Sequence, residues 1–194
     1  MTGISGVPWD AVELPSQFLE NWCWERGALD LVSSHVDTGE SLPDTLLQKL
    51  RGARNFQSGM QMVRQLEFAL FDFRLHASTA PISADAIQRL LDDVRQQVAV
   101  VIPPPFDRFP HAFSHIFAGG YAAGYYGYLW SEVLSADAYD RFEQEGVFNA
   151  TAGRAFMQHV LETGGVEEPL DVFKAFRGRE PSINAFLRHS GLNT

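Results

Sequence analysis

A stretch rich in histidine, glycine and tyrosine is the part of the sequence best suited to chemistry. Residues 111–128 read HAFSHIFAGGYAAGYYGY. Tyr121, Tyr125 and Tyr128 are spaced four and three residues apart, so on one helix their phenols would share a face. A phenol that faces a cleft can donate a hydrogen bond to a carbonyl or to the oxyanion of a tetrahedral intermediate. The alternative is that the three rings only pack in a core or an interface, which is the commoner use of such a stripe.

Glycines interrupt the same segment. Each of them lowers helix propensity, by up to about 1 kcal/mol relative to alanine. A cluster of this kind indicates close backbone approach or a hinge beside the phenols. The four positions are Gly119, Gly120, Gly124 and Gly127.

Two other residue types offer weaker signals. His111 and His115 are four residues apart, so one helix could turn both toward a metal ion. No carboxylate follows His111, and we do not expect this pair to hold zinc; a metal-binding scaffold that uses the two histidines is a third interpretation. The single cysteine, Cys23, lies between two tryptophans, and we predict a buried structural thiol there.

A polar stripe near the start of the sequence is the second candidate for chemistry. Glu13, Gln17 and Glu20 stand at i, i+4 and i+7, so they share one face of a helix that Pro15 would help to begin. This stripe is either a solvated face or part of a buried helix whose carboxylates need a metal or a cation. The second alternative is favoured by the surrounding apolar residues Phe18, Leu19, Trp22 and Trp24.

Helical periodicity dominates the elements that must position these residues, and it predicts an all-α fold. One apolar stripe with steps of three and four consists of Phe56, Met60, Val63, Leu66, Leu70 and Phe73. A second follows Ser83, a predicted N-cap with Asp85 in the first turn. Its members are Ile87, Leu91, Val94 and Val98. Ser41–Asp44 predicts another helix start, with a capping box and Pro43 in the first turn.

The second half of the chain continues in the same way. We predict a long helix from the glycines through about Glu145, one from residues 149–151 to Gly164, and two shorter ones at Glu168–Phe176 and Pro181–His189. The best strand candidate is Val98–Ile102, which ends at three prolines that we interpret as an extended connector. We therefore expect a single helical domain over residues 1–194.

Composition excludes several classes of protein. The chain has 194 residues, of which 45% are hydrophobic and 20% are charged, so it can form a core and is not disordered. A net charge of −9 without a basic cluster argues against nucleic acid as a partner. No apolar run approaches the roughly 18 residues of a membrane span, so we expect no membrane partner either. One cysteine fits a reducing, cytoplasmic compartment.

Four segments resemble the thimet oligopeptidase family (M3) of zinc metallopeptidases. Two contain the candidate residues, namely ELPSQFLENW at 13–22 and FAGGYAAGYYGYLW at 117–130. The others are LEFALFDFRLH at 66–76 and FKAFRGREP at 173–181. The resemblance extends over essentially the whole chain, but it includes only the C-terminal part of the family's catalytic domain. It implies a cytosolic, helical protein that takes part in cleaving short peptides.

The resemblance also implies a role for the acidic stripe. In the family, zinc is held by two histidines of an H-E-x-x-H helix and by a glutamate from a following helix. That glutamate corresponds to Glu13, and Glu20 would orient the ligand histidines.

For the tyrosine segment the resemblance implies contact with the peptide. The glycine-rich loop, which includes Gly119 and Gly120, would flex over the substrate. The catalytic residues that contact the scissile bond would be His115, Tyr121 and Tyr128, with Tyr128 as the first choice for the oxyanion donor. Tyr125 would line the same face and bind substrate.

The sequence departs from the family at one decisive place. No H-E-x-x-H occurs among the 194 residues, so two zinc ligands and the water-activating glutamate are missing. Because a catalytic zinc site needs three protein ligands, we expect this chain alone neither to bind zinc tightly nor to hydrolyse peptides. Activity would then need the missing N-terminal part of the peptidase as a partner. The alternative is a non-enzymatic helical remnant that folds and self-associates through apolar surface around Phe18, Trp22 and the tyrosines.

Overall fold

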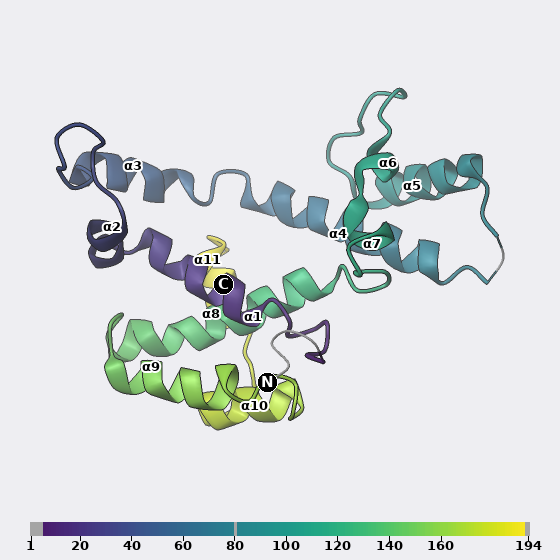
Figure 1. Cartoon of the computed structure of the whole chain (residues 1–194). Helices are drawn as coiled ribbons and strands as arrows, with labels where there is room; N and C mark the ends of the chain where they lie inside the picture. The colour runs from purple at the N-terminus through teal and green to yellow at the C-terminus, as the bar shows by residue number, and fades with distance from the viewer. Residues whose placement is uncertain (1–5, 80, 193–194) are drawn as a thin grey trace. The chain divides into compact units, whose positions relative to one another are not determined.

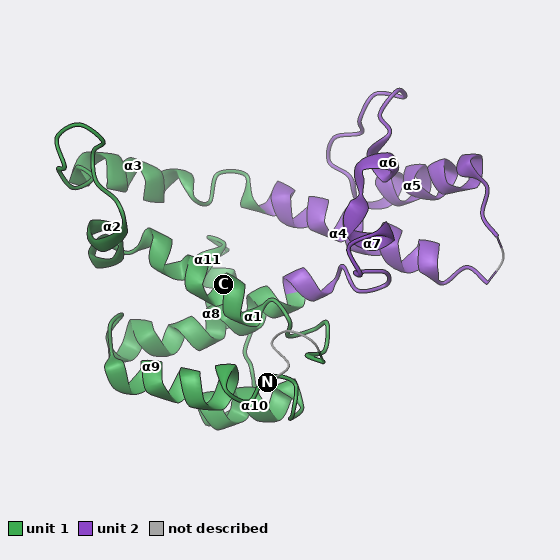
Figure 2. Cartoon of the chain, viewed as in Figure 1, with its two compact units in different colours: residues 1–58, 130–194 green, residues 59–129 purple. Residues whose placement is uncertain are grey.

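The computed structural model describes residues 6–79 and 81–192 and divides into two compact units (Figure 2). Unit 1 lies within residues 1–58 and 130–194, and unit 2 comprises residues 59–129. Every regular element of the described residues is a helix, which confirms the predicted fold class. None of the described helices is both long enough and apolar enough to span a bilayer. The single domain over residues 1–194 stays a prediction.

Unit 1 is built around the long helix α8. Its core joins α8 to α1, α9 and α10 through buried apolar side chains, among which the Phe18 ring stacks on Phe156 with centroids 3.9 Å apart. The elements, of which Figure 1 labels the α-helices, are α1 (Leu14–Glu20), the 3₁₀ helix η1 (Asn21–Trp24), α2 (Arg26–Val32), α3 (Asp44–Ala53), α8 (Gly127–Glu145, in unit 1 from Trp130), α9 (Ala150–Phe156), the π-helix η2 (Met157–Leu161), α10 (Pro169–Arg177) and α11 (Asn184–His189).

Local signals fix some of these ends. Asn149 caps α9, since its Oδ1 accepts the N–H groups of Thr151 and Ala152 at 2.8 and 3.0 Å, which confirms the predicted start. The helical path ends with η2 at Leu161, before the predicted Gly164. The capping box at Ser41 was a wrong prediction, because α3 begins at Asp44 with Pro43 in the N-cap position and no side-chain cap.

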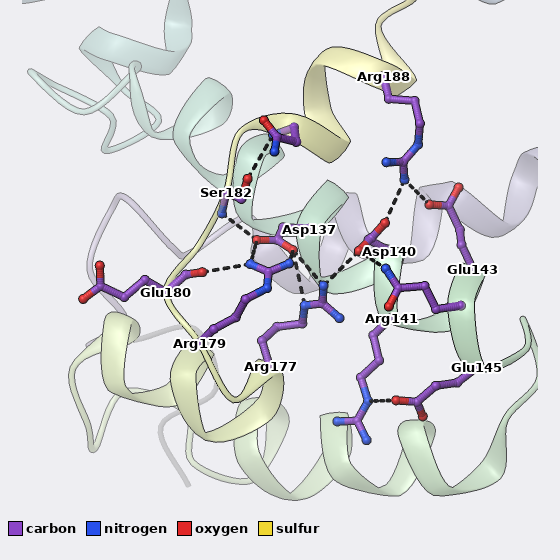
Figure 3. Close-up of polar contacts among 12 residues, drawn as sticks. Asp137, Asp140, Arg141, Glu143, Glu145, Arg177, Arg179, Glu180, Ser182 and Arg188 are labelled. Atoms are coloured by element: carbon purple, nitrogen blue, oxygen red, sulfur yellow. Dashed lines mark hydrogen bonds and ion pairs between the residues drawn. The ribbon is translucent and has the colours of Figure 1, made fainter. Parts of the chain in front are cut away.

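A buried carboxylate connects α8 to the end of the chain. Asp137 of α8 is 1% exposed and accepts hydrogen bonds from Arg177, Arg179 and the Ser182 N–H. Figure 3 shows both guanidinium groups reaching this carboxylate, that of Arg177 from the end of α10 and that of Arg179 from the segment that leads toward α11. The contacts tie that irregular segment to the centre of unit 1.

Unit 2 packs α4 against α5 and two short helices. Its elements are α4 (Ser58–His76, in unit 2 from Gly59), α5 (Ala84–Val98), α6 (Phe109–Ala112) and α7 (Ser114–Phe117). The Oγ of Ser83 accepts the Ala86 N–H, so the predicted cap of α5 is confirmed. The buried cluster between these helices consists of Phe71, Leu75, Leu91, Phe113 and Ile116.

Two expectations about unit 2 are wrong. Val98 ends α5, and residues 99–102 form no strand, while Val100, Val101 and Ile102 are exposed. The apolar stripe expected on α4 is also not its buried face, because Met60, Leu66 and Phe73 are exposed. The buried positions of α4 are instead Glu67, Ala69, Phe71, Asp72 and Leu75.

Candidate functional site

Four of the predicted site residues converge in unit 2. The rings of Tyr121 and Tyr128 stack with centroids 5.0 Å apart, and Tyr125 lies 5.1 Å from Tyr128. The His115 ring lies 6.0–6.2 Å from all three phenol rings. His115 is exposed and the tyrosines are half-buried, so these residues, called the tyrosine cluster below, open to the surface.

The tyrosines do not share a helix face, which corrects the expectation from their spacing. Tyr128 lies in the first turn of α8, whereas Tyr121 and Tyr125 lie in the irregular segment 118–126, and His115 is in α7. The rings meet because this segment folds back on α7, where the Tyr121 N–H donates to the His115 carbonyl at 3.0 Å.

Two of the predicted glycines allow this return. A Cβ on Gly119 would lie 2.9 Å from the backbone oxygen of His115, closer than side-chain carbons approach. Gly120 adopts a φ of +86°, which disfavours residues with a side chain. The close backbone approach expected from the glycines therefore occurs at Gly119.

Tyr125 differs from the other two tyrosines in its surroundings. Its hydroxyl donates to Oε1 of Gln65 at 3.0 Å, and the rings of Phe68 and Phe113 pack edge-on against it. Burial, and to a smaller extent the neighbouring Tyr128, raises the pKa of the Tyr125 phenol. The phenol therefore stays protonated at neutral pH, with its proton directed to Gln65.

Sequence reasoning missed a carboxylate that supports this cluster. Asp72 on α4 is 1% exposed, and its two oxygens accept the N–H groups of Ala123 and Tyr125 at 2.9 Å each. Nδ1 of His76 lies 2.8 Å from the same carboxylate. The signal in the sequence was that two acids, Glu67 and Asp72, interrupt an otherwise apolar helical run, LEFALFDF.

A second buried carboxylate of α4 holds arginines rather than the loop. Oε1 of Glu67 accepts Arg95 Nε at 2.9 Å and Arg64 Nη1 at 2.6 Å, and Arg95 also donates to Asp107 at 2.6 Å. This network joins α4 to α5 and to the segment before α6.

The acidic stripe belongs to unit 1. Glu13 is the N-cap residue of α1 and half-buried, with Oε2 accepting a hydrogen bond from Ser16 Oγ at 2.9 Å. Glu20, at the end of α1, is exposed. The helix is not buried all round as its apolar content suggested, because Leu14 and Phe18 are buried while Leu19 is 65% exposed.

The candidate metal ligands and the cysteine lie in separate elements of the structure. Within residues 6–79 and 81–192 no group of three His, Cys, Asp or Glu side chains could hold a metal ion. His111 and His115 lie in different short helices, separated by Phe113 with ψ near 62°. Glu13 offers one carboxylate where a catalytic zinc needs three protein ligands, so these residues do not by themselves fit the ion. Cys23 is exposed in η1, which corrects the expected buried thiol.

Comparison with known proteins gives one consistent result. A profile of Peptidase family M3 matches residues 1–192. Oligopeptidase A of Salmonella typhimurium and that of Escherichia coli are each 59% identical over 192 residues, which is 99% of this chain and 28% of theirs. A relative in Arabidopsis thaliana, named "Probable cytosolic oligopeptidase A", is 49% identical over 196 residues, with the same coverage. The chain thus spans about 28% of the length of these curated relatives.

Proposed function

The chain belongs to peptidase family M3, and from this premise we propose that it supplies a peptide-binding surface and one zinc ligand to an oligopeptidase. The observation that carries the proposal is the convergence of His115 with the three tyrosines. A neutral phenol is a hydrogen-bond donor, and aromatic rings offer a flat apolar surface to a short peptide. The substrates would be short peptides, and the location would be the cytoplasm, in line with the name of the Arabidopsis relative.

The members of the tyrosine cluster would have different roles. Tyr128 would donate a hydrogen bond to the developing oxyanion, with His115 and Tyr121 contacting the same peptide unit. Tyr125 would line the binding surface, because its own proton is already directed to Gln65. Gly119 and Gly120 would let the loop approach the substrate with its backbone.

On the metal side the chain would contribute a single carboxylate. Glu13 would be the ligand and Glu20 would orient the other ligands, which would come from residues outside this chain. Alone, the chain would therefore hold zinc weakly and leave peptides intact.

The experiment is complementation. The 194-residue chain is assayed with a short fluorogenic peptide and zinc, first alone and then with the part of Escherichia coli oligopeptidase A that precedes the matched segment. We expect no hydrolysis alone and chelator-sensitive hydrolysis in the mixture. Hydrolysis by the chain alone would contradict the proposed division of ligands.

A pair of matched variants tests the oxyanion role. Tyr128→Phe should lower kcat of the complemented enzyme by about 10²–10³ with little effect on KM. The control is Tyr126→Phe, which also loses one hydroxyl, from a ring that stacks on Phe73 at 5.2 Å. Equal kcat values for the two variants would return the tyrosine cluster to a packing role.

A second function is favoured by exposed apolar surface. Val100, Val101, Ile102 and Phe106 are 62–79% exposed, and such patches commonly mark association sites. The chain would then act as a helical association module. Concentration-dependent dimerisation in sedimentation, with no hydrolysis after complementation, would favour this alternative.

A further inference from the structure

A buried acid on α4 is the strongest feature not absorbed by the proposed function. Asp72 is buried, with 1% of its surface exposed. Both of its carboxylate oxygens accept hydrogen bonds from backbone N–H groups of the irregular segment 118–126. The third neighbour is Nδ1 of His76, one helical turn further along α4, at 2.8 Å. The acid therefore connects a rigid helix to the loop that contains Tyr121 and Tyr125.

The loop needs such an acceptor. Segment 118–126 forms no regular helix, and the N–H groups of Ala123 and Tyr125 make partly buried hydrogen bonds to Asp72, which satisfies these donors. Within it Ala123 adopts a φ of +55°, a conformation that residues with a Cβ rarely take. Hydrogen bonds to an ionised carboxylate are stronger than those to a neutral acceptor, so Asp72 can hold this conformation.

The two bonds fix the backbone on either side of Gly124. Ala123 N–H meets Oδ1 and Tyr125 N–H meets Oδ2, so the path from Ala123 to Tyr125 is set by a single side chain. One further residue, Tyr126, leads to the first turn of α8, which begins at Gly127 and carries Tyr128. The same face of α4 contributes Gln65, which accepts the Tyr125 hydroxyl.

We propose that Asp72, braced by His76, is the positioning residue of the tyrosine cluster, setting through the backbone of residues 123–125 where the phenols stand. Its link to peptide hydrolysis rests on the proposed function. The structural part of the proposal can be tested without activity.

The first test uses Asp72→Asn in the full chain. An asparagine of the same size has one carbonyl oxygen, so it can accept only one of the two N–H groups and turns an NH₂ toward the other. We expect amide hydrogen exchange at Ala123 and Tyr125 to accelerate about 10-fold or more, since a charge-assisted bond is lost. The matched control is Asp92→Asn on α5, an exposed residue whose Oδ1 accepts a hydrogen bond from Gln88 Nε2 at 2.9 Å.

The pattern of exchange decides the result. Acceleration confined to the loop, with α5 amides unchanged, supports the positioning role. Unchanged exchange at both loop amides overturns it, and so does uniform acceleration through unit 2, which would indicate a purely structural acid. As a second readout, the phenol titration of Tyr125 should shift toward its ordinary pKa in Asp72→Asn but not in the control.

A double-mutant cycle in the complemented enzyme tests the link to catalysis. If Asp72 acts through the tyrosine cluster, Asp72→Asn should lower kcat, and Tyr128→Phe should then cost less than in the wild-type background. If the two substitutions lower kcat by independent factors that multiply, the proposed coupling between Asp72 and the tyrosine cluster is wrong. A loosened loop with unchanged kcat would contradict the proposed function while leaving the structural role of Asp72 intact.

Discussion

Replacing Asp137 by asparagine should destabilise unit 1 more than other polar substitutions there. The carboxylate accepts Nε and Nη2 of Arg177 at 3.2 and 3.1 Å, and Nη1 and Nη2 of Arg179 at 2.7 and 2.5 Å. It also accepts the N–H of Ser182 at 2.6 Å. Asparagine keeps the volume but removes the charge and places an NH₂ among donors.

The expected loss of unfolding free energy depends on the arginines that remain without the Asp137 charge. Removing one partner of a buried ion pair costs about 3–5 kcal/mol, because the other charge is left uncompensated. The Arg177 side chain is 7% exposed but retains Asp140 at 2.9 Å, which places the expected loss at the lower end, about 3 kcal/mol. For a chain of this size that corresponds to a fall in Tm of roughly 6–12 °C.

Thermal unfolding followed by circular dichroism, with urea unfolding as a second measure, gives the difference. The control is Arg188→Gln, which removes two ion pairs, with Asp140 and Glu143, of an arginine side chain that is 49% exposed. Its cost should stay below about 1 kcal/mol. An Asp137→Asn protein that unfolds within about 1 kcal/mol of wild type would refute the claim that this carboxylate holds the chain end onto α8.

Three further changes should have measurable effects. Glu67→Gln, which removes the charge that pairs with the buried Arg95 while Asp107 remains at 2.6 Å, should cost about 3 kcal/mol in unit 2, read from hydrogen exchange of α4 and α5 amides. Asn149→Ala should lower stability in urea by about 1 kcal/mol through loss of the α9 cap. The hydrogen bond from His189 is the main cause that lowers the pKa of Glu143, so this acid stabilises the fold above its unfolded pKa near 4.5. That contribution disappears as pH falls through the lower folded value, and Glu143→Gln should therefore flatten the loss of stability between pH 5 and pH 3 in urea titrations.

Helix α5 shows where sequence reasoning succeeds. Its signals are local, since Ser83 caps its own helix and the buried Leu91 and Val94 fall on the periodic stripe. The same reasoning predicted a strand at Val98–Ile102, because β-branched residues favour strands. A strand needs a partner strand, and the described residues offer none.

Helix α4 shows where it fails. Hydropathy assigns Glu67 and Asp72 to the surface. The predicted buried stripe therefore lay on a different face of α4 from the one that is buried in the structure. Burial of these acids depends on Arg95 and on the N–H groups of Ala123 and Tyr125, which lie 28 to 53 positions further along the chain. No window of local sequence contains that compensation.

The prediction that the three tyrosines lie together was correct, but the predicted cause, a shared helix face, was not. Spacing on one helix was expected to bring the phenols together, and the rings do meet, but through a loop that folds back at Gly119 and Gly120. Residue types therefore identified the cluster, whereas its geometry depends on backbone conformations that glycine permits.

In each unit, a buried carboxylate on a helix accepts hydrogen bonds from a distant irregular segment. An irregular segment has N–H groups and arginines that no regular ladder satisfies, and a carboxylate has about four lone-pair sites for such donors. Asp137 receives the segment between α10 and α11, and Asp72 receives the segment before α8. A neutral side chain of the same size would satisfy fewer donors, and an apolar one would satisfy none. A buried acid in these helices is therefore compensated by donors from a distant part of the chain, which is an irregular segment for Asp137 and Asp72 and an arginine of α5 for Glu67.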